Sequence, residues 1–257
     1  MFRRWLPRRL SHGEEATLVE HLDELRSRLI VCIIAIVPAF AIAFAFHSQL
    51  IEWLTKAIPS DVKLVTLGVA EPFTTSMKVS FYAAVALVLP VILYETWAFL
   101  APAVEEDTQR VIAVFVVLAT ALFFAGVFFG YFLVLPPAVH FLTGFDANLY
   151  DVQVRASYYL TFATLLLFAM GIVFELPIFI LALVRLRVLS SAKLRRNRRT
   201  GYVAMLVIAI LLPTVDPVSL LFETIPLILL YEMSIWLAVV MERRWSRGWE
   251  DGLAGEY

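Results

Sequence analysis

The feature that most constrains this 257-residue chain is a long apolar stretch in its second half with one acidic side chain inside it. The 29 residues from Ala156 to Val184 carry a single formal charge, that of Glu175. At ~1.5 Å per residue, a helix of this length is longer than the ~30 Å hydrocarbon layer of a bilayer requires. The stretch is therefore predicted to span a membrane.

Glu175 lies well inside this predicted span. An ionised carboxylate that faces lipid costs ~2.5 to 3.5 kcal/mol or more. We therefore expect its side chain to face a polar partner or a water-filled hollow, or to be protonated. The structural alternative is a neutral acid that only ties neighbouring helices together.

Five further apolar segments predict an all-α integral membrane protein with a single polytopic domain. The chain is 61% hydrophobic, above the ~45 to 50% of soluble domains. The six predicted spans are residues 29–46, 79–100, 111–135, 156–184, 201–212 and 218–241. The last two are expected to be short, because Pro213 follows the fifth directly and Pro226 interrupts the sixth. The turn before the sixth span then leaves Asp216 below the lipid headgroups, in a hollow that Glu175 is expected to share.

Lysine and arginine are distributed unevenly along the chain. Of the 21 such residues, 17 lie in segments 1–28, 101–110, 185–200 and 242–257. The positive-inside rule places these segments in the cytoplasm. We therefore predict a multi-pass protein of the cytoplasmic membrane with an amphipathic cytoplasmic N-terminus and a cytoplasmic C-terminal tail. The basic segment 1–28 is too long to resemble a cleaved signal peptide, so the first span is expected to remain.

Signatures of enzymes are missing from the sequence. It has no GxxxxGK loop, no HExxH motif and no nucleophile elbow, and its four histidines lack ligand spacing. The single cysteine, Cys32, excludes an internal disulfide and a cysteine-built metal site. We predict no enzymatic activity, no cofactor, no metal and no nucleic-acid partner.

Acidic residues accompany the basic ones at the predicted cytoplasmic face. His21–Leu29, HLDELRSRL, is predicted to be an amphipathic turn that leads into the first span. The loop after the second span carries Glu105, Glu106 and Asp107. Two acidic patches of this kind suit a basic peptide at the membrane surface, because guanidinium pairs well with carboxylate. The alternatives are a solvated loop and ordinary flanking charge with local pairs such as Asp23 with Arg26.

Six sequence segments together point to a family. They are HLDELRSRL at 21–29, YETWAFLAP at 94–102, GVFFGYFLVLP at 126–136, GIVFELP at 171–177, LLPTVDPVS at 211–219 and IPLILLYE at 225–232. In order and separation they resemble the C subunit of the twin-arginine protein translocase, the TatC family. The resemblance covers nearly the whole chain, from about residue 17 to residue 240.

The resemblance implies a cupped, concave bundle of six helices that acts as a signal-peptide receptor and translocase core. It implies binding of folded precursors whose signal peptides carry paired arginines, and transport that draws on the proton-motive force. The expected partners are these precursors, single-span TatA/TatB-type subunits, membrane lipid and further copies of the chain.

Two sets of functional residues follow from the resemblance. The set at the signal-peptide site comprises Glu24, Arg26 and Phe99, with the loop acids Glu105, Glu106 and Asp107. The set within the membrane comprises Glu175, Asp216, Tyr131 and Glu232.

Three departures from the family pattern affect the recognition geometry. The family's loop glutamate falls on Thr108, so a neighbouring loop acid has to replace it. A periplasmic proline falls on Trp53, and the Thr-Pro before the acidic turn reads Pro213-Thr214. These departures leave room for a paralogue with altered signal preference.

Two other functions use the same residues. A proton-coupled secondary transporter of a small solute would employ Glu175 and Asp216 as proton carriers, but the sequence shows no internal repeat. An intramembrane protease would need a catalytic pair, which Glu175 and Asp216 match poorly. Binding of a small solute, as opposed to an arginine-bearing peptide at Glu24, distinguishes a transporter from a receptor.

Overall fold

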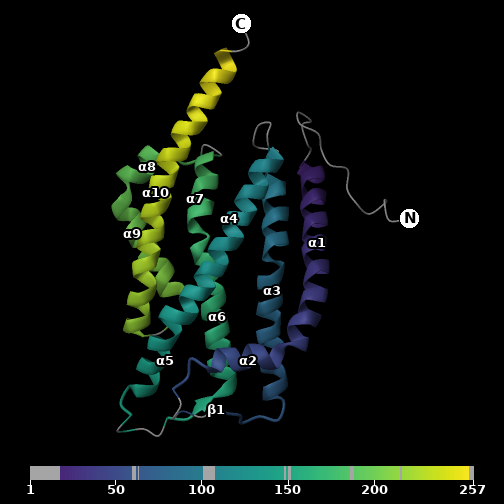
Figure 1. Cartoon of the computed structure of the whole chain (residues 1–257), viewed down its shortest axis with the longest axis vertical. Coiled ribbons are helices and arrows are strands. Elements are labelled where there is room, and N and C mark those ends of the chain that lie inside the picture. Colours follow the sequence, from purple (N-terminus) through teal and green to yellow (C-terminus); the bar gives the residue numbers. More distant parts are fainter. Residues whose placement is uncertain are drawn as a thin grey trace, which may run out of the picture.

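Long helices make up most of the structure, and many of them run close to its longest axis (Figure 1). The computed structural model describes residues 18–59, 62, 64–100, 108–147, 149, 152–185, 188–214 and 216–254. The longest helices are α1 (Leu18–Ala45), α3 (Glu71–Leu100) and α10 (Pro217–Ala254). We call the end of the molecule at which α1 begins and α3 and α10 end the upper end, as in Figure 1, and the opposite one the lower end.

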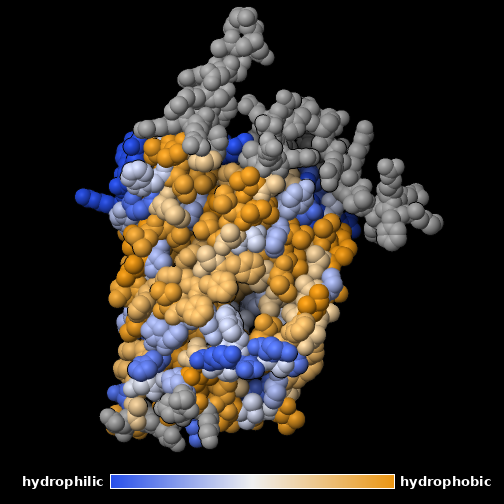
Figure 2. All heavy atoms as spheres, in the orientation of Figure 1, coloured by the Kyte–Doolittle hydropathy of each residue, from blue (hydrophilic) through white to orange (hydrophobic). Residues whose placement is uncertain are grey.

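Within the described residues, five helical segments are long and apolar enough to cross a membrane. They are His21–Ala45, Glu71–Phe99, Ala113–Gly144, Ala156–Arg185 and Pro217–Glu242. Apolar side chains cover most of the visible face between its two ends (Figure 2). The prediction of a helical membrane protein is confirmed. The predicted fifth span lies in α9 (Arg198–Leu211), whose 14 residues fall short of the ~20 of an ordinary span.

Helices α1 and α3 begin earlier than hydrophobicity alone predicts. α1 starts at Leu18, so the charged segment 21–28 belongs to the first turns of the same helix that contains the first apolar segment. α3 starts at Glu71, whose side chain accepts hydrogen bonds from the N–H groups of Leu67 and Gly68. The carboxylate thus binds N–H groups of the loop before α3, and its charge in the first turn complements the helix dipole.

The third apolar segment continues past the two prolines near which its end was predicted. α4 (Thr108–Phe129) leads into a π-helical turn, η3 (Gly130–Val134), and then into α5 (Leu135–Gly144). Pro136 and Pro137 have no N–H groups for the carbonyls one turn earlier. The wider π-helical turn before them accommodates the two missing hydrogen bonds, so the chain remains helical from α4 into α5.

Glu175 marks a break in the fourth apolar segment, between α6 (Ala156–Phe174) and α7 (Leu176–Arg185). The N–H of Glu175 donates to the carbonyl of Ile172, only three residues earlier. Pro177 has no N–H group to continue the α-helical pattern. The chain therefore tightens for one turn at the carboxylate and becomes helical again directly afterwards.

The C-terminal part contains α8 (Ser191–Arg196), α9 and α10, with α10 packed against both α7 and α9. Asp216 precedes α10, and its Oδ1 accepts a hydrogen bond of 2.7 Å from the N–H of Ser219. Pro217 occupies the first helical position, where its missing N–H is not needed. The helix then continues for 38 residues, well beyond the predicted end at residue 241.

Two glycines allow α4 and α6 to pack closely. A Cβ atom at Gly126 would lie 2.6 Å from the carbonyl oxygen of Met170, and one at Gly171 would lie 2.5 Å from the ring of Phe123. Small residues commonly permit such approaches between membrane helices. Phe123 and Met170 are both fully buried at this contact, and Met170 belongs to the main hydrophobic core.

The starts of α3 and α6 are joined at the lower end. Strands β1 (Leu64–Val65) and β2 (Val154–Arg155) pair in parallel there. The Nε of Arg155 donates to Oε1 of Glu71 at 3.0 Å, and the N–H of Ser157 donates to the same oxygen at 3.2 Å. The hydrogen bond to Glu71 raises the pKa of the Arg155 guanidinium above its ordinary value. Glu71 thus connects the loops that precede the two helices.

Candidate functional site

Charged side chains of α1 and α3 form a cluster at the upper end. The Nη2 and Nε of Arg28 donate to Oε1 of Glu24 at 2.6 and 3.1 Å. The Nη1 of Arg28 donates to Oε2 of Glu95 at 2.9 Å, and its Nη2 also donates to the carbonyl of Ala98 at 3.2 Å. One guanidinium therefore joins two carboxylates that come from different helices.

Phe99 lies at the same α1–α3 contact. Its ring stacks on the ring of His21 with 4.3 Å between the centroids. The structure thus brings the predicted residues Glu24 and Phe99 to one region, whereas Arg26 is exposed on α1. The predicted loop acids lie outside the described residues; they are Glu105, Glu106 and Asp107.

Two members of this cluster are absent from the predicted set. The spacing of Glu24 and Arg28, four residues apart on a helix, is a recognisable signal for an ion pair, although the predicted local pair is Asp23 with Arg26. Glu95 interrupts an apolar span, which by itself marks a functional candidate. Its partner on α1 follows only from the packing of two helices that are distant in sequence.

Glu175 is half-buried at the junction of α6 and α7. Its Oε1 is buried and receives no hydrogen bond from the described part of the chain. A buried acceptor without a donor is costly, because it has lost its hydrogen bonds to water. The structure therefore leaves this carboxylate able to accept a hydrogen bond from another molecule or from water.

Asp216 has different surroundings. It is 4% exposed and caps α10, while Glu223 on the same helix is fully buried. The hydroxyl of Thr214 donates to Oε2 of Glu223 at 2.9 Å. The other oxygens, Oδ2 of Asp216 and Oε1 of Glu223, accept no hydrogen bond from the residues described. Glu223 lies within the predicted sixth span but is not among the predicted site residues, so this pair of acids is a further feature that the sequence analysis missed.

The remaining two predicted membrane residues connect helices. The hydroxyl of Tyr131 donates to the carbonyl of Trp53 in α2 (His47–Thr55) at 2.8 Å, and the two rings stack 3.7 Å apart. Glu232 accepts a hydrogen bond from the Tyr202 hydroxyl and pairs with Arg198 at 3.2 Å. Tyr131 therefore joins η3 to α2, and Glu232 joins α10 to α9.

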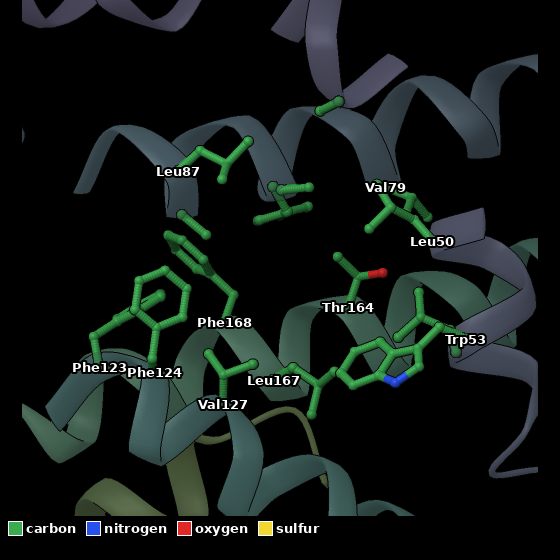
Figure 3. A pocket seen from close by; sticks show the side chains of 15 residues that line it. Leu50, Trp53, Val79, Leu87, Phe123, Phe124, Val127, Thr164, Leu167 and Phe168 are labelled. Atoms are coloured by element: carbon green, nitrogen blue, oxygen red, sulfur yellow. The ribbon is translucent and has the colours of Figure 1, made fainter. Parts of the chain in front are cut away.

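An apolar cavity of about 250 Å³ lies between α1, α2, α3, α4 and α6 (Figure 3). Aromatic rings such as those of Trp53 and Phe168 line it, together with the hydroxyl of Thr164. Among the described residues, its lining includes neither Glu175 nor Asp216. This cavity is therefore not the hollow predicted for Glu175 and Asp216, and their common hollow stays a prediction. The cavity suits an apolar group better than a charged one.

The described residues contain no group of three or more His, Cys, Asp or Glu side chains placed to hold a metal ion. Cys32 is partly buried in α1. The chemistry that the candidate site offers is thus that of carboxylates, one guanidinium and aromatic rings. These groups bind cationic and apolar ligands.

Comparisons with known proteins give a consistent picture. The family model "Sec-independent protein translocase protein (TatC)" matches residues 20–226. TatC from Magnetococcus marinus is 33% identical over 90% of this chain and 87% of its own length. TatCd from Bacillus subtilis is 32% identical over 91% of this chain and 96% of its own length.

The fold agrees with this picture. A crystal structure of the twin arginine translocase receptor TatC in DDM superposes with a TM-score of 0.76 at 35% identity, and the match covers 85% of this chain and 99% of that one. The matched proteins are components of a protein translocase, so this chain is a transport subunit and not an enzyme. The matches confirm the predicted resemblance along nearly the whole chain: the protein belongs to the TatC family of Sec-independent protein translocase proteins.

Proposed function

We propose that this protein is the signal-peptide receptor and core subunit of a twin-arginine translocase. It binds precursors whose signal peptides carry paired arginines and moves them, folded, across the cytoplasmic membrane with energy from the proton-motive force. The observation that carries the proposal is the placement of Glu24 at the upper end of the bundle, beside Glu95 and Phe99. Hydrogen bonds between guanidinium and carboxylate are roughly twice as strong as neutral ones.

In the proposed topology the chain crosses the cytoplasmic membrane six times, with α9 as the short fifth span and both termini in the cytoplasm. The start of α1 and the end of α10 lie at the same end, as an even number of crossings requires (Figure 1). The distribution of lysine and arginine supports a cytoplasmic position of this upper end. Because α9 is shorter than the other spans, the bundle is concave on that side. The bilayer must thin beside this short span.

The signal peptide contacts two parts of the receptor. Its arginine pair docks at Glu24, with Arg26, Phe99 and the loop acids completing the cytoplasmic site; these loop acids are Glu105, Glu106 and Asp107. Its apolar part runs along the bundle toward Glu175, whose free Oε1 supports contact with a polar group of the ligand or with water.

Partner subunits bind elsewhere on the bundle. Single-span TatA/TatB-type subunits dock along α9 and α10, where the short α9 creates a mismatch with the bilayer and the partly exposed Glu232 provides a polar group. Tyr131 supports the outer side of the bundle through α2. Several copies of the chain associate in the working complex.

The direct test measures binding of a peptide that contains paired arginines and an apolar segment to the full-length protein in detergent. Replacing Glu24 by Gln removes the charge at nearly constant volume. The affinity is expected to fall roughly 10- to 150-fold, since a hydrogen bond to a charged group contributes ~1.5 to 3 kcal/mol. The matched control is Glu52→Gln, at an exposed glutamate of α2.

Two outcomes contradict the proposal. One is a wild-type protein that binds the arginine peptide no better than a peptide with paired lysines. The other is a Glu24→Gln variant with unchanged affinity, which removes Glu24 from the docking site. A proton-coupled transporter of a charged solute finds little support in the cavity of Figure 3, because its lining is apolar.

A further inference from the structure

The carboxylates that Arg28 joins are only partly covered. The side chains of Arg28, Glu24 and Glu95 are 20%, 15% and 17% exposed. The cluster is thus neither sealed within the packing nor fully solvated. A charged group from outside can reach it, and electrostatic attraction at such a site is stronger than in bulk water.

The charges within the cluster do not balance. Glu24 and Glu95 contribute two negative charges, and Arg28 contributes one positive charge. Among the residues whose side chains the structure describes, no second lysine or arginine lies within ion-pair distance of either carboxylate. The addition of one more cation would make the cluster neutral.

The cluster also has more hydrogen-bond acceptors than donors, in line with its excess of negative charge. Both hydrogen bonds from Arg28 to Glu24 end on Oε1. The Oε2 of Glu24 is buried and receives none from the described residues. All three nitrogens of the Arg28 guanidinium are already engaged, with Glu24, Glu95 and the carbonyl of Ala98. The missing donor must therefore come from another group.

We infer that Glu95 is a second arginine-binding residue of this site, and that Arg28 is a positioning residue that holds Glu24 and Glu95 toward one another. The inference rests on the proposed receptor function. An arginine of the signal peptide reaches the cluster through its exposed part and binds the carboxylates of Glu24 and Glu95, while Arg28 keeps its own hydrogen bonds.

This geometry selects arginine over lysine. A planar guanidinium has five N–H donors in a fixed fork and can bridge two carboxylates, as Arg28 itself does. A lysine ammonium is a compact point charge and satisfies both carboxylates less well. Glu95 therefore contributes to the preference for arginine as well as to the affinity.

The experiment compares peptides with paired arginines and paired lysines on the full-length protein in detergent. The variants are Glu95→Gln, Glu24→Gln and the control Glu52→Gln. Glu95→Gln is expected to weaken binding of the arginine peptide about tenfold or more, with a smaller loss for the lysine peptide. The control is expected to bind like the wild type, because Glu52 lies on α2 and is 73% exposed.

Direct contact is tested by a double-mutant cycle. Each peptide arginine in turn is replaced by citrulline, its neutral isostere, and bound to wild type and to Glu95→Gln. If the combined loss of binding free energy differs from the sum of the two single losses, that peptide arginine contacts Glu95. Additive losses in every cycle would overturn the assignment, since they show no contact.

The outcomes for Glu95 and for the receptor function are distinguishable. If Glu24→Gln loses affinity while Glu95→Gln binds like the wild type, Glu95 has only a structural role and the receptor function stands. If the wild type does not prefer the arginine peptide, both proposals fail. Thermal unfolding shows whether each variant is folded. If Glu95→Gln does not fold, Glu95→Asp, which keeps the charge on a shorter side chain, replaces it in the cycle.

Arg28→Lys tests the positioning role. A lysine keeps the charge but cannot bridge both carboxylates as the guanidinium does. The variant is expected to lose affinity for the arginine peptide and to lose part of its preference over the lysine peptide. A gain in affinity would instead show that Arg28 occupies the ligand's place and would refute the positioning role.

Discussion

Glu24 and Glu95 at the upper end differ from Asp216 and Glu223 at the start of α10 in what neutralises each carboxylate. The first two come from separate helices and share the guanidinium of Arg28. The second two lie seven residues apart on one segment and accept hydrogen bonds only from a backbone N–H and a hydroxyl among the described residues. Their exposures differ in the same sense: the side chains of Glu24 and Glu95 are 15% and 17% exposed, whereas Asp216 and Glu223 are 4% and 0% exposed as whole residues.

The difference shows that burial decides whether a carboxylate in a membrane protein can bind a ligand or only stabilises the structure around it. A carboxylate held by a cation at the edge of the bundle can stay ionised and still attract a ligand. A fully buried carboxylate without a cation is costly to ionise, so its hydrogen bonds contribute mainly to local structure. We therefore propose ligand binding for the first pair and stabilisation of the α9–α10 turn for the second.

The largest effect is expected for Arg28→Ala, which leaves Glu24 and Glu95 close together without their cation. Removing one partner of a buried ion pair costs ~3 to 5 kcal/mol, and partial exposure here reduces this to about 2 kcal/mol of unfolding free energy. Chemical unfolding in detergent measures the loss. Arg26→Ala is the control, because Arg26 is exposed on the same helix and should change stability by less than ~0.5 kcal/mol. Equal losses in the two variants would contradict the role of the bridge.

A smaller loss is expected for Asp216→Ala. The substitution removes the oxygen that accepts the N–H of Ser219, and loss of an N-cap costs ~1 kcal/mol. Thermal unfolding measures this change. Asp216→Asn keeps a capping oxygen without the charge and should retain most of the stability. If Asn and Ala destabilise equally, the charge of Asp216 matters and not its cap.

The smallest effect is expected for Glu223→Gln. The new side chain keeps an oxygen for the Thr214 hydroxyl and removes a charge that no described cation balances. Stability should therefore change by less than ~0.5 kcal/mol, and affinity for the arginine peptide should stay the same. A loss comparable to that of Arg28→Ala would show that a cation accompanies Glu223, and the contrast between the two pairs would disappear.

The sequence predicted the membrane-spanning segments better than their ends. Long apolar runs identify spans because lipid requires them. The ends depend on hydrogen bonds that hydrophobicity does not register. α3 begins at Glu71 because loop N–H groups bind that carboxylate, and helical structure continues through Pro136 because a π-helical turn precedes it.

The candidate site was predicted only where its members are local in sequence or match the family. Glu24 and Phe99 are recognisable from their motifs, and the spacing of Glu24 and Arg28 is a helical signal. Glu95 joins them because α1 packs against α3, a contact between segments about 70 residues apart. The expectation of one recess for Glu175 and Asp216 stays a prediction, since depth along the membrane does not fix which helices are neighbours.

The bond between Glu71 and Arg155 also bears on how the bundle moves. It fastens the first turn of α3 to the chain just ahead of α6, and the paired strands β1 and β2 reinforce the joint. Both contacts lie near the first residues of the two helices and neither of them lies near the upper end of α3. The bond therefore limits how far the lower ends of α3 and α6 can separate, whereas it does not hold the upper end, where Glu24 and Glu95 meet and where we propose that the signal peptide binds.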